Sequence, residues 1–444
     1  MSVGDEIELR ADRPANGGAA VGRADDGRVV FVSGAIPGEQ VRARIREERR
    51  GFVTADTLEI ITASPHRRSG VCAAAAHGAG CCDADFVDPA HLRELKAVVL
   101  TDVLSRVGHL DENTINRALA DGGGHDIQAL DDADTGWRIR TRLAVDSTGA
   151  PGWHRRGDAG IITGYACAQP DPRMLTELDA LGGADGFMPA AELAVVLDDA
   201  GRRHVTEIAP APSPTRRGRS ARGRGDRAAA QRRRRHGERA RARRVLDGAE
   251  TARHRVGART WDIPVTGFWQ GHRAAPRVYS ETVAQFVNDF AGSARDGVYW
   301  DLYGGAGVFA ATALDSLGAR EVHLVDSDAG ALTAAADTFG ADPVGIHRGE
   351  VTAVTTTLPT PQVVILDPPR TGAGSAVVGQ IAAAAPALVV HVGCDVARFA
   401  RDLEVFGEHG YRPVAIRAFD AFPLTHHLEA IAALVPDPGY RISE

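Results

Sequence analysis

The order of apolar and polar residues divides the chain into a beginning rich in short strands and an end in which strands and helices alternate. Residues 6–9, 29–32 and 41–45 carry strand-like patterns, and turns that contain glycine or proline separate them. Short strands in such close succession predict a small β-barrel of the oligonucleotide-binding type over residues 1–62.

From Trp261 onward, apolar runs typical of buried strands alternate with helical patterns. We expect helices over residues 276–291 and 396–409. The expected strands span residues 298–302, 321–326, 362–366, 387–393, 412–419 and 428–434. This alternation predicts an α/β fold with a doubly wound sheet, whose ligand crevice lies at the carboxyl ends of the strands.

The middle of the chain has a mixed pattern. It predicts a helix over residues 90–107 and strands over 137–145 and 160–167. Residues 209–245 are low-complexity Pro, Arg, Gly and Ala, and we predict no fold for them. The predicted domains are the barrel at 1–62, a mixed central α+β domain at 63–255 and the α/β domain at 256–444.

Charge is distributed unevenly along the chain. The 444 residues carry a net charge of −7, but residues 216–244 contain 14 arginines against Asp226 and Glu238, a local charge of +12. Lys96 is the only lysine in the sequence. A basic segment of this kind can contact a polyanion such as RNA. The alternative is a solvated linker whose charge has no specific partner.

The sequence also indicates a compartment. It contains no apolar run long enough to span a membrane, and it begins without a basic and apolar leader. Five cysteines in such a chain indicate a reducing compartment, in which thiols bind metals or take part in catalysis. We therefore expect a cytoplasmic protein without membrane contact and without an obligate protein partner.

Two motifs indicate a nucleotide-type cofactor. Residues 301–307 follow an expected strand and open a helix, and their glycines allow the backbone to approach a ligand closely. They lack the lysine of a phosphate-binding loop. Asp326 ends the next strand, where a carboxylate can accept hydrogen bonds from ribose hydroxyls. Together they predict an adenosine-containing cofactor; the alternative is a tight turn and a solvent-facing aspartate.

Three further residues lie next to later strands. Asp367 begins an Asp-Pro-Pro-Arg turn, whose prolines keep the loop rigid. Cys394 follows the strand at 387–393, and the positive end of the helix after it would favour the thiolate. Glu429 lies in an apolar stretch and is a candidate acid or base. The structural alternatives are an ordinary turn, a core thiol and a surface glutamate.

These motifs, in this order, resemble the S-adenosylmethionine-dependent RNA 5-methyluridine methyltransferases. Residues 25–32 and 36–39 resemble the TRAM RNA-binding domain, and residues 261–444 resemble the catalytic domain of that family. The resemblance implies a Rossmann-like class I methyltransferase domain, an N-terminal TRAM barrel and a mixed central domain.

The resemblance also implies a cofactor site. Gln270, in Phe-Trp-Gln, matches the segment whose glutamine contacts the cofactor. Tyr303 and Asp326 fall where the family contacts S-adenosylmethionine, and Asp367 matches the aspartate of its fourth motif. These four residues are therefore the predicted cofactor-binding set.

Two residues would carry the chemistry. Cys394 falls on the family's nucleophile, and Glu429, in Phe-Pro-x-Thr-x-His-x-Glu, falls on the proposed general base. The chain departs from the family around the thiol, because relatives usually have Ser-Cys-Asn/Asp-Pro where residues 393–396 read Gly-Cys-Asp-Val. The departure concerns the geometry of the loop and leaves the thiol in place.

A metal site is a further implication of the resemblance. Many relatives hold a 4Fe–4S cluster on Cys-x5-Cys-x2-Cys and a distant cysteine. Here Cys72, Cys81 and Cys82 are separated by eight and by no residues, and Cys167 follows later. The four cysteines either bind such a cluster or are buried thiols without a metal, and the adjacent pair strains the binding of one cluster.

The implied reaction is methylation of carbon 5 of a uridine in RNA. Carbon 5 of uracil is a poor nucleophile, and addition of a thiolate at carbon 6 activates it. A target uridine must leave its stack, which favours a loop or a single strand. The N-terminal barrel resembles the ribosomal-RNA branch, so 23S ribosomal RNA is the favoured substrate. The alternatives are uridine methylation in transfer RNA, amino-group methylation of a base, and a non-catalytic RNA-binding factor on a methyltransferase scaffold.

Overall fold

The computed structural model describes residues 2–211, 241–437 and 439. Contacts between residues divide the chain into two compact units. The first unit comprises Met1–Val71, Cys82–Asp134 and Ala274–Glu444, and the second comprises Cys72–Cys81 and Thr135–Arg273. Most of the arginine-rich segment, up to residue 240, lies outside the described residues. The three-domain division drawn from the sequence stays a prediction.

The first unit begins with a closed β-barrel, as predicted. Its strands are β1 (Glu6–Pro14), β2 (Ala20–Arg23), β3 (Val29–Ser33), β4 (Gln40–Glu48) and β5 (Phe52–Thr62), joined in the order β1-β2-β3-β5-β4. Alternate residues of β4, Val41, Ala43 and Ile45, are buried in the barrel core, while their neighbours face solvent. This alternation is what period-two patterning dictates for a strand with one buried face.

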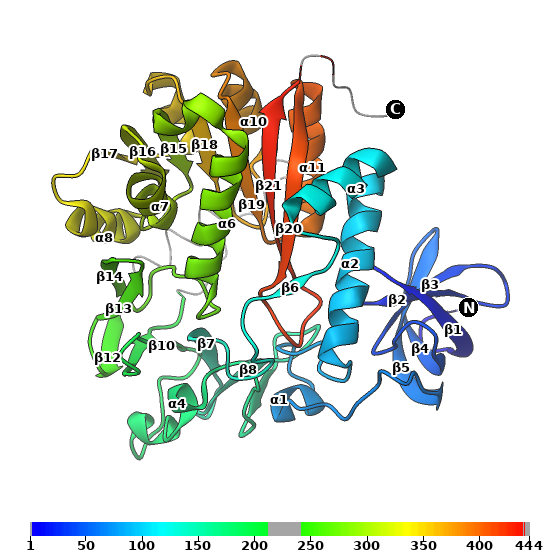
Figure 1. Cartoon of the computed structure of the whole chain (residues 1–444). Helices are drawn as coiled ribbons and strands as arrows, with labels where there is room; N and C mark the ends of the chain where they lie inside the picture. Colours follow the sequence, from blue (N-terminus) through cyan, green and yellow to red (C-terminus); the bar gives the residue numbers. More distant parts are fainter. Residues whose placement is uncertain (1, 212–240, 438, 440–444) are drawn as a thin grey trace, which may run out of the picture. The chain divides into compact units, whose positions relative to one another are not determined.

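The same unit contains the predicted doubly wound sheet. Its strands run in the order β17-β16-β15-β18-β19-β21-β20-β6 (Figure 1). They are β6 (Gln128–Ala129), β15 (Val298–Leu302), β16 (Glu321–Asp326), β17 (Val344–Arg348), β18 (Val363–Leu366), β19 (Leu388–Gly393), β20 (Tyr411–Asp420) and β21 (Glu429–Pro436). The strands from β17 to β19 are parallel, and β21 lies antiparallel between β19 and β20. Every residue of β15, β18 and β19 is buried, which explains their continuous apolar runs.

Helices cover the sheet. They are α2 (Pro89–Arg106), α3 (Glu112–Gly122), α6 (Ala275–Phe290), α7 (Val308–Leu317), α8 (Ala329–Phe339), α9 (Val351–Val354), α10 (Gly374–Ala383) and α11 (Val396–Glu408). Helices α2, α3, α10 and α11 share one apolar cluster with the strands, to which Leu104, Phe399 and Phe406 contribute. Asp395 caps α11 by accepting the N–H of Arg398 at 3.0 Å, which fixes where the helix starts after β19.

The second unit contains a sheet in the order β12-β11-β10-β7-β8-β9 and a hairpin of β13 and β14. The strands are β7 (Arg140–Val145), β8 (Pro151–His154), β9 (Ile161–Thr163), β10 (Glu192–Leu197), β11 (Arg203–Ile208), β12 (Arg243–Asp247), β13 (Thr251–Val256) and β14 (Arg259–Pro264), with short helices α1 (Ala73–Ala76) and α4 (Pro172–Leu175). Strand β12 falls partly within residues for which the sequence predicted no fold. It forms through pairing with β11, and Arg244 binds the buried Glu207 at 3.0 Å.

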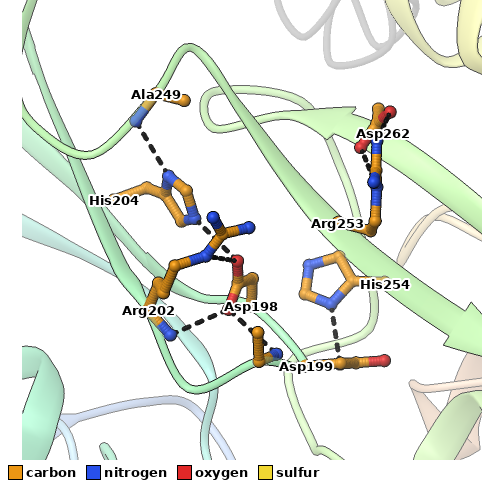
Figure 2. A network of polar contacts seen from close by, with 9 residues as sticks. Asp198, Asp199, Arg202, His204, Ala249, Arg253, His254 and Asp262 are labelled. Atoms are coloured by element: carbon orange, nitrogen blue, oxygen red, sulfur yellow. Dashed lines mark hydrogen bonds and ion pairs between the residues drawn. The ribbon is translucent and has the colours of Figure 1, made fainter.

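Polar contacts hold the turns of this second unit (Figure 2). Asp198 accepts the Arg202 guanidinium at 2.9 Å and His204 Nε2 at 3.2 Å, while His204 Nδ1 accepts the N–H of Ala249 at 2.9 Å. The turn between β10 and β11 is thereby tied to the segment before β13. Among the helices of the described residues, none has the length and apolar character to cross a membrane.

Candidate active site

The carboxyl edge of the sheet brings together residues that are far apart in the sequence. Asp326 ends β16, Tyr303 follows β15, Asp367 follows β18 and Cys394 follows β19. Glu429 begins β21, which runs antiparallel, so the start of that strand lies at the same edge. The strand order β16-β15-β18-β19-β21 therefore arranges five of the predicted site residues in one row.

The glycine-rich loop is fixed by Asp326. Its Oδ2 accepts the N–H of Gly305 at 3.0 Å, and its Oδ1 accepts the N–H of Asp328 at 2.7 Å. A Cβ on Gly304 would lie 2.3 Å from a methyl group of Leu324, so a side chain does not fit there. Tyr303 adopts a φ of 60°, which is uncommon for a residue with a side chain and is typical of functional sites. Burial raises the pKa of Asp326 despite its two amide donors.

Asp301, near the end of β15, is a site residue for which the sequence predicted no role of its own. It is fully buried, and its Oδ2 accepts the N–H of Ala310 at 2.9 Å. Its Oδ1 is also buried and has no hydrogen-bond partner within the described residues. Burial, together with the charges of Asp367 and Asp326, raises the pKa of this carboxyl to about 7, and the amide of Ala310 opposes the rise. A buried acceptor without a donor is costly, and a proton, an ordered water or a ligand group can offset that cost.

Cys394 and Glu429 are placed next to each other by strand register. Gly393 on β19 pairs with Ala430 on the antiparallel strand β21. The same register, continued by one residue, places Cys394 opposite Glu429. Burial, and then the negative charges of Glu429 and Asp367, raises the pKa of the Cys394 thiol to about 12. The sequence predicted that the following helix would favour the thiolate, but burial and the two carboxyl groups favour the protonated thiol.

Asp367 and Arg370 carry opposite charges on the loop after β18. Burial raises the pKa of Asp367 to about 7, although His391 lowers it. Burial and the charge of Asp367 raise the pKa of Glu429 well above its usual 4.5. The positive charge of Arg370 acts in the opposite direction and lowers the pKa of both Glu429 and Cys394. This arginine was visible in the Asp-Pro-Pro-Arg motif, but the sequence alone did not show that it faces the thiol.

The loop that leads to Glu429 is anchored by polar contacts with Asp83 and with Lys96. His426 donates its N–H to Asp83 at 3.0 Å, and its ring also contacts the Asp83 carboxylate. Lys96 is fully buried and binds Asp420 at 2.6 Å, at the end of β20. These contacts hold both ends of the segment before β21, which has to present Glu429 at a fixed position.

Gln270 lies in the second unit, after β14 and next to the buried Trp269. Trp269 stacks on His254, with ring centres 4.9 Å apart, and packs against Trp261. The row of residues at the sheet edge therefore does not include Gln270, and its role at the cofactor stays a prediction.

The four predicted metal ligands lie together. The Sγ atoms of Cys72, Cys81, Cys82 and Cys167 are all within 4.8 Å of one another, and those of Cys72 and Cys81 are 3.6 Å apart. All but Cys81 are buried. The chain thus forms a compact four-thiol cluster, although the spacing of its cysteines departs from that of the relatives.

This chain is similar to known proteins in its N-terminal domain and over its full length. The TRAM domain family matches residues 2–58. A protein of Corynebacterium glutamicum named as an RNA methyltransferase is 39% identical over 98% of both chains. One of Streptomyces avermitilis is 31% identical over 98% of this chain and 99% of its own.

A solved structure shares the fold. The crystal structure of a Pyrococcus abyssi tRNA (uracil-54, C5)-methyltransferase in complex with S-adenosyl-L-homocysteine covers 96% of this chain and 99% of its own. The TM-score is 0.67 at 17% sequence identity, so this likeness concerns the fold. The full-length sequence relatives identify the family: the chain belongs to the RNA methyltransferases and carries a TRAM domain at its N-terminus.

Proposed function

We propose that this protein methylates carbon 5 of a uridine in RNA, with S-adenosylmethionine as the methyl donor and Cys394 as the nucleophile. One observation carries the proposal. A thiol and a buried carboxyl face each other at the sheet edge: Cys394 directly follows β19, and Glu429 is the first residue of β21. Amino-group methylation of a base would need neither this thiol nor its partner acid.

The acids at the sheet edge fit a cationic cofactor. The pKa values of Asp301, Asp326 and Asp367 are all raised, chiefly by burial. A ligand that carries an ammonium and a sulfonium group would relieve that cost, and the unpartnered Oδ1 of Asp301 would accept the ammonium. Asp326 keeps acceptor capacity for ribose hydroxyls. When bound, S-adenosylmethionine supplies an electrophilic methyl group.

Cys394, which is partly exposed, has to release its proton to solvent before it can react. With its pKa near 12, the resting thiol is almost entirely protonated at neutral pH. Arg370 and a cation bound beside Asp367 would both stabilise the thiolate. Sγ then forms a bond to carbon 6 of the uracil, and the electron pair of the 5,6 double bond moves toward oxygen 4. The resulting enolate gives carbon 5 the electron density that methyl transfer requires.

Glu429 completes the cycle. After methylation, carbon 5 carries a proton that a base has to remove. The Glu429 carboxylate takes that proton, the 5,6 double bond re-forms, and the bond between Sγ and carbon 6 breaks to release the thiolate. A cation in the crevice favours the ionised carboxylate at Glu429, as it favours the thiolate.

The RNA substrate is a separate part of the proposal. We favour ribosomal RNA, and the TRAM domain supports an RNA substrate in general. The presence of the barrel does not distinguish ribosomal RNA from transfer RNA as the substrate, because a transfer-RNA enzyme has the same fold over 96% of this chain. Transfer RNA therefore remains the second candidate.

The cysteine cluster would hold a metal. Four thiolates around one ion at about 2.3 Å form a tetrahedron with edges of about 3.8 Å, close to the spacing of these sulfurs. In a 4Fe–4S cluster each cysteine binds a different iron, so the sulfurs have to stand farther apart. The spacing thus fits a single ion better than the cluster, and no step of the reaction involves it.

The proposal is tested by mapping 5-methyluridine by mass spectrometry in ribosomal and transfer RNA from cells with and without the gene. Loss of one 5-methyluridine, restored by the wild-type gene and not by Cys394→Ala, is the expected result. Restoration by Cys394→Ala would contradict the covalent mechanism. Calorimetry with S-adenosylmethionine tests the non-catalytic alternative, which predicts no binding.

A further inference from the structure

A histidine lies buried beside the predicted nucleophile. His391 is on β19, three residues before Cys394, and is fully buried. Its Nδ1 is 2.8 Å from the carbonyl oxygen of Val392, and its Nε2 is 3.1 Å from Oδ2 of Asp402. Phe399 and Phe406 of α11 pack edge-on against its ring. The ring therefore has one position, fixed from both nitrogens.

Asp402 connects three parts of the site. Besides His391, it accepts the N–H of Ala373 at 2.7 Å and the N–H of Gly374 at 3.0 Å. Those amides belong to the start of α10, directly after the Asp367–Arg370 turn. A Cβ on Gly372, whose φ is +80°, would lie 2.9 Å from Asp402 Oδ2. One carboxylate thus joins the nucleophile strand, the helix after it and the loop that carries Asp367.

The hydrogen bonds indicate which protons the His391 ring carries. A carbonyl oxygen can only accept, so Nδ1 has to carry a proton. Asp402 is ionised, since its hydrogen bonds from His391 and the two amides outweigh the effect of burial and lower its pKa. An ionised carboxylate also only accepts, so Nε2 has to carry the second proton. A ring with both protons is an imidazolium cation.

The second unit offers a contrasting histidine. His204 also binds an aspartate through Nε2, but its Nδ1 accepts the N–H of Ala249 (Figure 2). That nitrogen cannot carry a proton, so His204 is a neutral ring. Two buried histidines that both pair with aspartate thus differ in charge because the partner of Nδ1 differs.

We propose that His391 is a positioning residue for the methylation: a buried imidazolium, held by Asp402, that fixes the Cys394 and Asp367 segments and places a positive charge behind Asp367. The proposal rests on the function proposed above. His391, Cys394 and Asp402 line one small pocket together with Arg370 on the loop and with Asp395 and Arg398 at the start of α11. The positive charge of His391 also acts on Asp367 and lowers its pKa, which burial raises to about 7.

The protonation state can be measured on the full-length protein. Among the 16 histidines, the His391 signals are those that disappear from a long-range ¹H–¹⁵N spectrum of His391→Asn. We expect both His391 nitrogens to give protonated shifts at pH 8, and His204 to give one protonated and one unprotonated nitrogen. An unprotonated nitrogen at His391 at pH 8 would overturn the inference. If His391→Asn does not fold, Asp402→Asn identifies the same signals by their shift, and this measurement requires no activity.

The positioning role is tested by adduct formation with RNA that contains 5-fluorouridine. For His391→Asn we expect the acid limb of the rate profile to move to higher pH by about one unit, because the variant lacks the positive charge that lowers the pKa of Asp367. Binding of S-adenosylmethionine should show that the variant is folded, and His204→Asn is the matched control with an unchanged limb. An unmoved limb in His391→Asn would contradict the role. Failure of wild type to form any adduct would instead contradict the proposed function.

Discussion

Asp301 offers a prediction in which stability and ligand binding change in opposite directions. The perturbation is Asp301→Asn, which keeps an oxygen for the N–H of Ala310 and removes the charge. Burial raises the pKa of Asp301 from 3.8 to about 7. The folded state therefore holds a proton that the unfolded chain has released. The stability linked to this proton is complete below pH 3.8 and is lost as the pH rises to about 7.

The magnitude follows from the difference in pKa. A difference of about three pH units corresponds to about 4 kcal/mol of unfolding free energy, since each unit is worth about 1.4 kcal/mol. Between pH 5 and pH 8 the loss at Asp301 should be about 3 kcal/mol. Other buried acids contribute to the same decline in the wild type, so the useful quantity is the difference between variant and wild type.

The assay is urea unfolding at pH 5 and pH 8. From pH 5 to pH 8, we expect the unfolding free energy of Asp301→Asn to fall by about 3 kcal/mol less than that of the wild type. Asp337→Asn, at an exposed position on α8, is the control and should leave the decline unchanged. Parallel declines in Asp301→Asn and wild type would refute the reasoning that burial keeps this carboxyl protonated.

The same substitution should weaken the ligand. If Oδ1 of Asp301 accepts the cofactor's ammonium, loss of a hydrogen bond to a charged group removes about 1.5–3 kcal/mol. Calorimetry should therefore show S-adenosylmethionine binding about 10- to 100-fold more weakly in Asp301→Asn. Unchanged affinity would place the ammonium elsewhere and leave the unpartnered oxygen without an explanation.

Three further predictions concern other parts of the site. Glu429→Gln should still form the covalent adduct with uridine RNA but release product about 10²- to 10⁴-fold more slowly, so a methylated adduct should accumulate on denaturing gels; normal turnover would contradict its role as base. Asp326→Ala should lose both the ribose contact and the anchor of Gly305, and its affinity for S-adenosylmethionine should fall at least 10-fold by calorimetry; wild-type affinity would exclude Asp326 from the cofactor site. Elemental analysis of the purified protein should find one zinc ion per chain, and Cys72→Ser should lose it. Four iron atoms per chain would contradict the proposal of a single ion.

Much of the fold could be predicted from the sequence because its strands are buried on both faces. The apolar runs that predicted strands at 298–302 and 321–326 coincide with β15 and β16. The glycine-rich loop and the Asp-Pro-Pro turn were expected after strands, and in the structure they come directly after β15 and β18. Local sequence determines such strands and turns, so they can be predicted without knowledge of tertiary contacts.

Other features depend on contacts between distant segments. The sequence predicted no fold for 209–245, yet β12 begins at Arg243 because β11 offers it a partner. The charge state of Cys394 depends on Glu429 and Asp367, which come from other strands. The roles inferred for Asp301 and His391 likewise depend on which partners face their polar atoms. Neither spacing nor residue type reveals such partners, because tertiary packing sets them.

The central claim is that Cys394 attacks carbon 6 of a uridine. Its most direct test is incubation of the protein and S-adenosylmethionine with RNA that contains 5-fluorouridine, followed by mass spectrometry of the digested complex. Fluorine cannot leave as a proton does, so the reaction should stop at a methylated adduct joined to the peptide that contains Cys394. An adduct on that cysteine, absent from Cys394→Ala, is the result that we predict. Methylation of uridine RNA without any adduct in the fluorinated RNA would contradict the claim.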